Sequence, residues 1–224
     1  MQRILDILFS SLAVLFLIPL FLLIIVLLKF TGEGEILYRQ PRIGKERRVF
    51  QIWKFSTMLK NSFQMNNGDI TVANDPRVLP IGKFLRFSKI NELPQLVNIL
   101  IGDMSIVGPR PLTPRTFSAY PTGLQELILK IRPGLSGIGS IVFRDEESLL
   151  VSENRPSDFY KNIIAPYKCR LEIWYVENKN LKNYFLLILM TCFAIFFSNK
   201  RILWKIFKGL PLPPEELVNF LDIK

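Results

Sequence analysis

The sequence predicts a mostly helical α+β protein with a small β-hairpin or sheet and an N-terminal helix inserted in a membrane. Three observations support this fold class. The run Ile7–Leu28 carries no charge. Residues 34–58 hold two short apolar stretches rich in β-branched and aromatic side chains, which is typical of strands. Residues 79–100 place apolar side chains at helical spacing.

Composition narrows the class of protein. The chain has 224 residues, of which 49% are hydrophobic, and a mean hydropathy of +0.26, which is more apolar than a typical soluble domain. A formal net charge of +10 indicates an anionic partner. Because the N-terminus is apolar, we favour a membrane surface and phosphate-bearing substrates over nucleic acid, for which no recognition motif is present.

The absence of histidine excludes His-based triads and His-ligated zinc. Two cysteines, Cys169 and Cys192, make no disulfide framework, which is consistent with a cytoplasmic setting.

The N-terminal apolar run is long enough to cross a bilayer, which takes about 20 helical residues. Pro19 lies in its middle, where a proline removes a backbone hydrogen bond and kinks the helix. Basic residues flank both ends, with Arg3 on one side and Lys29 and Arg39 on the other. The positive-inside rule therefore places both ends in the cytoplasm. From the residues alone, a single-pass helix with a tolerated proline is favoured over a re-entrant one.

The next segments predict a hairpin and a helix. Residues 35–44 and 49–55 read as two strands joined by a basic turn. The helix predicted over 79–100 contains Pro94, which bends or restarts it. Asn91 and Glu92 therefore lie near an irregular point, where side chains are able to face a ligand.

The C-terminal part predicts a helix in the membrane interface. Residues 183–197 are apolar but short for a membrane span. Lys200, Arg201 and Trp204 follow, which is typical of an amphipathic interfacial helix. A thin transmembrane segment and a buried helix stay open as alternatives. After Gly209 we expect a short loop and a terminal helix.

The stretch that carries chemistry runs from Asn91 through Leu96 and continues in Gly102–Pro111. Pro109 and Pro111 forbid a regular helix, and the arginine between them, Arg110, is well placed to bind a phosphate or a carboxylate. A structural ion pair at a helix-to-loop junction explains the same residues equally well.

These motifs resemble the membrane-bound bacterial sugar transferases, the monotopic phosphoglycosyl transferases. Glu92–Leu96 matches the end of that family's Asp-Glu-Leu-Pro-Gln-Leu run, while Gly102–Ser105 and Gly108–Pro111 match its Gly-Asp-Met-Ser and Gly-Pro-Arg-Pro motifs. Further matches are Gln40, Arg42, Gly44, Lys54, Phe55, Thr57, Met58, Arg86 and Arg132–Gly137. Two departures stand out: Asn91 replaces the family's nucleophilic aspartate, and Ser56 replaces an arginine.

The resemblance implies a function. The family transfers a sugar-1-phosphate from a UDP-sugar to a polyprenol phosphate (undecaprenyl phosphate) and releases UMP, using Mg²⁺ and a covalent aspartyl intermediate. This is the first membrane step of a bacterial surface glycan such as an exopolysaccharide or lipopolysaccharide, at the cytoplasmic face of the inner membrane. The resemblance also favours a re-entrant helix broken at Pro19. The expected domains are a membrane-inserted helix over 1–30, a catalytic-type domain with interfacial helices over 31–198, and a basic C-terminal tail over 199–224.

The resemblance also assigns roles to single residues. Glu92 binds Mg²⁺ or orients the phosphate, Arg110 and Arg86 hold the diphosphate, and Lys54 and Arg132 support the electrostatics. Membrane lipid is an expected partner, and a homodimer or assembly with other glycan enzymes is left open.

Asn91 leaves the nucleophile undecided, because an amide is a poor nucleophile. In the first alternative another carboxylate attacks: Asp145 is our hypothesis, with Asp103 and Glu92 as rivals. In the second, the polyprenol phosphate attacks the UDP-sugar directly. In the third, the chain is a catalytically inactive relative that serves as a membrane scaffold or a lipid- or nucleotide-binding partner.

Overall fold

The computed structural model describes residues 1–31, 33–62, 65, 75–146, 149, 156–196 and 199–222. Helices make up 58% of the structure and strands 12%, which confirms the mostly helical α+β class. The first half contains α1 (Gln2–Phe30), β1 (Leu37–Ile43), η1 (Lys45–Arg47), β2 (Val49–Phe55), α2 (Pro80–Phe87), η3 (Ile90–Glu92), α3 (Gln95–Ile101) and β3 (Ser105–Val107). The second half contains α4 (Pro114–Ser118), α5 (Thr122–Ile128), β4 (Gly134–Ser136), α6 (Ile138–Val142), α8 (Pro156–Phe159), η4 (Tyr160–Ile164), α9 (Ala165–Glu177), α10 (Leu181–Phe196), α11 (Arg201–Ile206) and α12 (Glu215–Val218).

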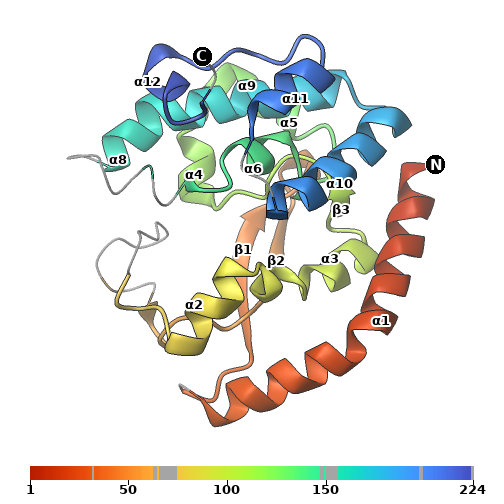
Figure 1. The fold of residues 1–224 in the computed structure, drawn as a ribbon, viewed down its shortest axis with the longest axis vertical. Helices are drawn as coiled ribbons and strands as arrows, with labels where there is room; N and C mark the ends of the chain where they lie inside the picture. Colours follow the sequence, from red (N-terminus) through yellow and green to blue (C-terminus); the bar gives the residue numbers. More distant parts are fainter. Residues whose placement is uncertain are drawn as a thin grey trace.

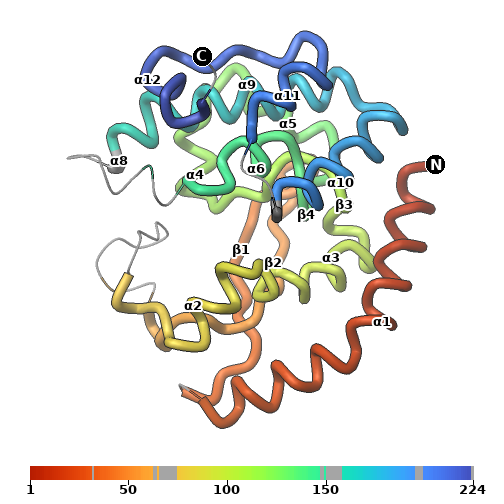
Figure 2. Tube along the Cα trace, in the orientation of Figure 1, coloured from red at the N-terminus to blue at the C-terminus, as the bar shows by residue number. Residues whose placement is uncertain are grey.

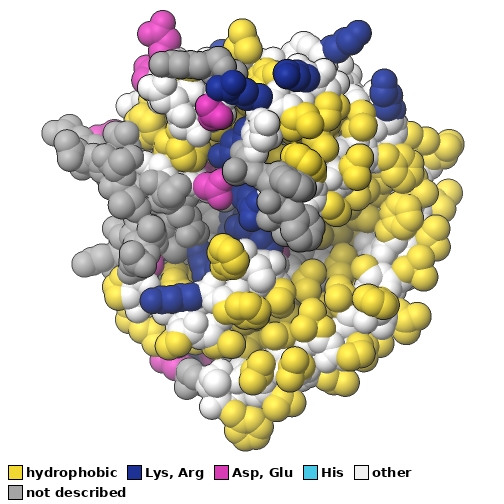
Figure 3. All heavy atoms as spheres, viewed as in Figure 1, with side chains coloured by type: hydrophobic (Ala, Val, Ile, Leu, Met, Phe, Trp, Pro, Cys, Tyr) yellow, Lys and Arg dark blue, Asp and Glu magenta, His cyan; other side chains and the backbone are white. Residues whose placement is uncertain are grey.

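The N-terminal helix α1 is long, apolar and bent, with Pro19 inside it (Figure 1). Within the described part of the chain it is the helix long and apolar enough to cross a membrane, with a mean hydropathy of 3.2 over its most apolar window. Much of its surface is exposed, as the following side chains show: Ile4, Leu8, Leu12, Leu15, Phe16, Leu22, Leu23, Val26 and Phe30. Figure 3 shows hydrophobic side chains covering the side of the molecule where α1 lies. A water-soluble protein rarely exposes such an area, so this surface is suited to lipid.

Both ends of α1 are fixed to the same body. Near its start, Gln2 Nε2 donates to Ser105 Oγ at 2.9 Å, and Arg3 Nη2 donates to the Leu100 carbonyl at 2.9 Å. The buried carboxylate of Asp6 accepts a hydrogen bond from Ser105 Oγ at 2.8 Å. Near the other end, Leu28 packs in one apolar cluster with residues of β2 and α2. The middle of the helix packs on the same body through Val14, Leu17 and Phe21, so α1 lies along the domain with its outer surface exposed.

Strands β1 and β2 form the predicted antiparallel hairpin, with Leu37 paired to Phe55 and Ile43 to Val49. A second, parallel pair joins β3 to β4 and aligns Ser105 with Gly134 (Figure 2). This pair brings the loop after β3 against the glycine-rich turn around Gly134, although 26 residues separate the two strands along the chain.

The helix predicted over 79–100 is divided in three. Helix α2 ends at Phe87, and Lys89 adopts a left-handed conformation with φ 59°. The short 3₁₀ turn η3 follows, and Pro94 is the N-cap of α3. The restart at Pro94 is confirmed, but the first break lies earlier than the proline and has no sequence signal as strong.

The main core surrounds α9, whose Tyr167, Leu171 and Tyr175 are fully buried. Residues 199–222 also belong to this core: Leu203, Phe207, Leu210, Leu217 and Leu221 are buried, and Trp174 Nε1 donates to the Lys208 carbonyl at 3.2 Å. The C-terminal residues thus pack over α9 (Figure 1). Helix α10 buries Tyr184 and Leu187 but exposes Phe185 and Leu189, so its role as an interfacial helix stays a prediction.

Candidate active site

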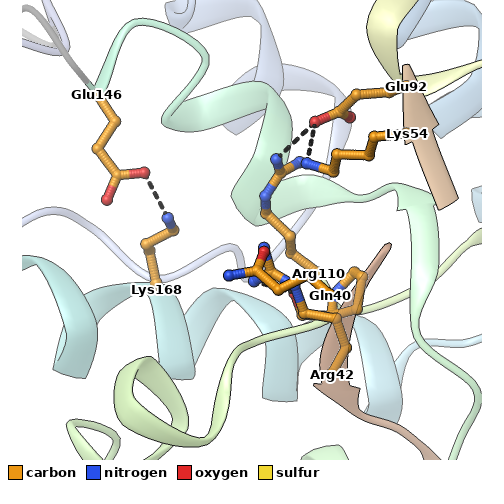
Figure 4. Close-up of polar contacts among 8 residues, drawn as sticks. Gln40, Arg42, Lys54, Glu92, Arg110, Glu146 and Lys168 are labelled. Carbon is orange, nitrogen blue, oxygen red and sulfur yellow. Dashed lines mark hydrogen bonds and ion pairs between the residues drawn. The ribbon is translucent and has the colours of Figure 1, made fainter. Parts of the chain in front are cut away.

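A carboxylate with two cationic partners forms the centre of the candidate active site. Glu92 accepts hydrogen bonds through one oxygen, Oε1, from Lys54 Nζ and from Arg110 Nη2, each at 3.0 Å (Figure 4). Lys54 comes from β2, Glu92 from η3, and Arg110 from the loop after β3. The Arg110 side chain is 35% exposed, against 17% for Lys54 and 14% for Glu92. The fold therefore joins three residues singled out in the sequence, with the arginine nearest to solvent.

The tight turn η3 explains how neighbouring residues take different positions. The Glu92 amide donates to the Lys89 carbonyl at 3.0 Å, which closes the turn. Asn91 is buried at 6% exposure, while Glu92 reaches Lys54 and Arg110. Pro94 then starts α3 without needing a backbone donor. The irregular point expected at Asn91 and Glu92 is confirmed.

Arg42, on β1, ties the hairpin to the Arg110 loop. Its Nη1 donates to the Pro111 carbonyl at 3.2 Å, and its Nη2 donates to Gln40 Oε1 at 2.6 Å. Figure 4 places both side chains beside Arg110. A third cation therefore stands near Arg110 and is close enough to Lys54 to affect its pKa.

This cluster holds three cations, Lys54, Arg110 and Arg42, and one acid, Glu92. The excess of positive charge shifts the pKa values of Glu92 and Lys54. Burial opposes ionisation of Glu92, but the charges of Lys54 and Arg110 outweigh it and hold its pKa well below the usual value. Burial lowers the pKa of Lys54 to about 8, and although Glu92 counters this, Arg110 and Arg42 add to the lowering. Figure 3 shows Lys and Arg side chains gathered in the middle of the face it draws. An arrangement with excess positive charge is suited to a phosphate or diphosphate.

A second ion pair, which sequence reasoning missed, faces this cluster. Lys168 Nζ on α9 lies 2.7 Å from Glu146 Oε2, and the lysine side chain is 4% exposed. Glu146 raises the pKa of Lys168 against the opposing effect of burial. Figure 4 shows this pair across from Lys54, Glu92 and Arg110. Its sequence signal was Lys168 and Glu172, two charges four residues apart among the apolar positions of α9.

The three other predicted residues are Arg86, Arg132 and Asp145. Arg86 is in the last turn of α2 and half-buried. Arg132 is exposed, and its Nε donates to the Gly102 carbonyl at 2.7 Å, at the end of α3. Asp145 lies 3.5 Å from Lys200 and lines a small pocket with Met190. Its neighbour Glu146 lies across from Arg110 (Figure 4), and the role given to Asp145 stays a prediction.

Asn91 and Glu92 are the two side chains of the cluster to consider as ligands of a magnesium ion. Among the described residues no group of three His, Cys, Asp or Glu side chains is placed to hold a metal. The buried amide oxygen of Asn91, Oδ1, has no hydrogen-bond partner among the described atoms. Mg²⁺ often binds through one or two protein oxygens together with substrate phosphates. The Glu92 carboxylate and the Asn91 amide oxygen are ligands of the kind that Mg²⁺ takes, and magnesium binding at this site stays a prediction.

Comparison with known proteins places the chain in a family. A sequence model described as "Bacterial sugar transferase" matches residues 1–198. The chain is 38% identical over 161 residues to the exopolysaccharide production protein ExoY of Sinorhizobium fredii, covering 66% of this chain and 71% of that protein. It is 37% identical over 145 residues to the UDP-glucose:undecaprenyl-phosphate glucose-1-phosphate transferase of Klebsiella pneumoniae, covering 62% of this chain and 30% of that protein.

A third relative has a different sugar in its name. The UDP-N-acetylgalactosamine-undecaprenyl-phosphate N-acetylgalactosaminephosphotransferase of Aeromonas hydrophila is 39% identical over 146 residues, covering 63% of this chain and 34% of that protein. The match to the family model extends over the N-terminal helix, the hairpin and the Lys54, Glu92 and Arg110 cluster. On these grounds the chain belongs to the bacterial sugar transferase family, and is an enzyme of the phosphoglycosyl transferase type.

Proposed function

We propose that this chain transfers a sugar-1-phosphate from a UDP-sugar to undecaprenyl phosphate and releases UMP. The observation that supports this most directly is the Glu92 carboxylate shared by Lys54 and Arg110, with Arg42 beside them. This excess of cations suits a diphosphate, and the relatives' names contain both substrates. The product would start a surface glycan such as an exopolysaccharide.

The cluster would stabilise the charge that moves during transfer. An oxygen of the acceptor phosphate forms a bond to the phosphorus that carries the sugar. The bond from that phosphorus to the bridging oxygen breaks, and its electron pair leaves with UMP. Arg110 and Lys54 would neutralise the leaving phosphate, and Glu92 would hold both cations in place. A magnesium ion held by Glu92 and the Asn91 amide oxygen would add Lewis-acid polarisation of the diphosphate.

We propose that the acceptor phosphate attacks directly, without a covalent enzyme intermediate. Asn91 has no carboxylate, and Glu92 is bound to two cations. The remaining candidates contact other groups: Asp103 accepts a hydrogen bond from Asn98 at 3.3 Å, and Asp145 pairs with Lys200. These contacts favour direct displacement over attack by a protein carboxylate.

Isotope exchange tests this proposal. Purified protein with magnesium and a UDP-sugar would receive labelled UMP, with and without undecaprenyl phosphate. Direct displacement predicts UMP release only with acceptor, and no label in the UDP-sugar without it. Exchange without acceptor would show a covalent intermediate, and loss of that exchange in Asp145→Asn would assign it to Asp145. The Asn91→Asp variant supplies a nucleophile and is the positive control for exchange.

An inactive scaffold that binds lipid or nucleotide is the second candidate function, favoured by Asn91 and Ser56 in place of the family's aspartate and arginine. The same assay separates the two. Binding of UMP with no release across a panel of UDP-sugars would support the scaffold. UMP release above a Glu92→Gln blank would support the transferase.

We also propose that α1 enters the inner membrane from the cytoplasmic face and returns to it. Both ends of the helix contact the same domain, its outer surface is apolar, and Pro19 lies within it. The test labels a cysteine added before Met1, and separately a Lys29→Cys variant, with a membrane-impermeant maleimide in Cys-free protein. We expect both to react only after permeabilisation of the inner membrane. Labelling of one end alone from the periplasm would indicate a single-pass helix.

A further inference from the structure

A second glutamate lies behind Arg110. Glu172, on α9, is 1% exposed, and its Oε1 accepts a hydrogen bond from the Arg110 backbone amide at 3.3 Å. Its other oxygen, Oε2, has no partner among the described atoms. Burial raises the pKa of Glu172 to about 7, against the lowering effects of the Arg110 amide and the Lys168 charge. Glu172 has no role in the function proposed above.

The backbone of the Arg110 loop explains why this contact matters. Pro109 and Pro111 have no N–H group, so the Arg110 amide is the single donor between them. The Pro109 carbonyl accepts from the Gly134 amide at 2.8 Å, and the Pro111 carbonyl accepts from Arg42. The remaining donor would be buried without a partner if Glu172 were absent. A side chain from α9 thus completes the hydrogen bonding of a loop 62 residues away in the sequence.

The glycine-rich turn leaves space for this carboxylate. A Cβ atom at Gly139 would lie 2.4 Å from Glu172 Oε1, and one at Gly137 would lie 3.7 Å from Oε2. A Cβ at Gly137 would also lie 2.2 Å from the Gly108 carbonyl oxygen. A side chain at Gly139 would therefore separate Glu172 from the loop, whereas one at Gly137 would clash with the Gly108 backbone and only touch Glu172. The close approach therefore requires glycine, most clearly at Gly139.

We propose that Glu172 is a positioning residue, which holds the backbone of Arg110 so that the guanidinium reaches Glu92 and a bound anion. The link to catalysis rests on the proposed function, whereas the positioning itself does not. An apolar side chain would fill this place in the core at lower cost, because a buried carboxylate with one unpaired oxygen destabilises the fold. Residues that cost stability in this way are found where function requires them.

The first experiment measures the hydrogen bond itself. Hydrogen exchange followed by mass spectrometry, on full-length protein in detergent, reports the peptide that contains Arg110. Glu172→Ala should expose one additional amide to exchange at least about 10-fold faster, because the donor loses its acceptor. Glu172→Gln keeps an oxygen at the same position and should exchange like wild type. Unchanged exchange in Glu172→Ala would overturn the proposal.

The second experiment measures the consequence for the ligand. UMP binding by calorimetry should weaken about 10-fold in Glu172→Ala, since a displaced arginine loses affinity steeply with distance. In the transfer assay the KM for the UDP-sugar should rise more than kcat falls, and Glu172→Gln should restore both. A general loss of folding would instead lower kcat and the melting temperature together, without restoration by glutamine, and would count against positioning.

A pair of glycine variants provides the sharpest control. Gly139→Ala should displace Glu172 and reproduce the exchange and UMP phenotypes of Glu172→Ala. In the Glu172→Ala background it should add nothing further, so the two changes are coupled. Gly123→Ala is the matched control, because a Cβ at Gly123 meets nothing within 4 Å. Additive effects of Gly139→Ala and Glu172→Ala would reject the proposed contact.

The two experiments fail in different ways. Faster exchange in Glu172→Ala, together with wild-type protein that neither binds UMP nor releases it, would support positioning and reject the proposed function. Normal exchange in Glu172→Ala, with active wild-type protein, would reject positioning and leave the proposed function supported.

Discussion

Two glutamates contact Arg110, and they differ in their partners and in their pKa values. Glu92 meets the guanidinium in front and also binds Lys54, whereas Glu172 meets the backbone amide behind and has one oxygen without a partner. The pKa of Glu92 lies well below its usual value because two cations outweigh burial, while burial raises the pKa of Glu172 to about 7. The contrast teaches that partners, rather than burial alone, decide the charge of a carboxylate in this site.

The same contrast explains how the arginine is held. Its charged end is balanced by Glu92, and its backbone is fixed by Glu172 and by the neighbouring carbonyls. An anion that approaches Arg110 therefore meets a cation whose position is set before binding. Preorganised charge of this kind costs no rearrangement when the phosphate arrives.

The largest expected effect comes from neutralising the front glutamate. Glu92→Gln leaves Lys54 and Arg110 close together with no acid between them, so their positions and the protonation of Lys54 both change. We expect UMP release to fall about 100-fold, in the range found for loss of one preorganised electrostatic group. The measurement is the initial rate of UMP release, with the melting temperature as a check of folding. A folded Glu92→Gln protein that works at the wild-type rate would refute the assigned role.

Removing Lys54 should give a smaller loss and change the pH dependence. With a pKa of about 8, Lys54 is protonated below that pH and neutral above it, so anion binding should weaken as the pH rises through 8. Lys54→Met should lower UMP affinity about 10-fold at pH 7, equivalent to the loss of one charge-assisted contact. The UMP affinity of the Lys54→Met variant should not change between pH 7 and pH 9. Calorimetry at three pH values measures this, and a decline with pH that persists in Lys54→Met would assign it to another group.

The raised pKa of Glu172, the glutamate behind Arg110, should make the stability of the protein depend on pH. A folded-state pKa of about 7, against 4.5 for the ordinary carboxyl, means that the folded protein holds a proton which the unfolded chain has lost. Wild-type stability should therefore fall as the pH rises from about 4.5 to about 7 and then stay low. Glu172→Gln should be more stable than wild type by about 1 kcal/mol at pH 8 and equal to it at pH 4.5. Thermal denaturation of both proteins at pH 4.5 and pH 8 measures this difference in stability. A Glu172→Gln protein that is more stable than wild type only at pH 4.5 would contradict the prediction.

The fold was predictable where local chemistry dominates. The uncharged run at the N-terminus predicted the helix α1, and the two apolar stretches predicted the hairpin of β1 and β2. The break at Lys89 was not predictable, because a left-handed lysine has no composition signal comparable to Pro94. The parallel pairing of β3 with β4 was also beyond reach, since each strand has three residues and its partner is remote in sequence.

The candidate site was predictable in part. Lys54, Glu92 and Arg110 were identified from motifs, and the structure brings them into contact. Sequence reasoning selected Asp145, whose role stays a prediction, and it missed the adjacent Glu146, which pairs with Lys168. A sequence alone does not show which of two adjacent acids in a turn faces a neighbouring helix. Glu172 was missed because an isolated acid on a helix is normally exposed. Three of its four neighbours at three-residue and four-residue spacing on α9, namely Cys169, Tyr175 and Val176, are apolar, and this was the available signal.

The smallest effect should come from a third glutamate that also binds an arginine. Glu126 pairs with Arg47, but the side chains are 64% and 55% exposed. Water screens this pair and offers each charge other partners, so Glu126→Gln should change the free energy of unfolding by less than about 0.5 kcal/mol and leave UMP release unchanged. Parallel thermal and activity measurements with Glu92→Gln provide the comparison. Equal losses in the two variants would mean that an arginine partner alone makes a glutamate important here, and the argument from burial at Glu92 would fail.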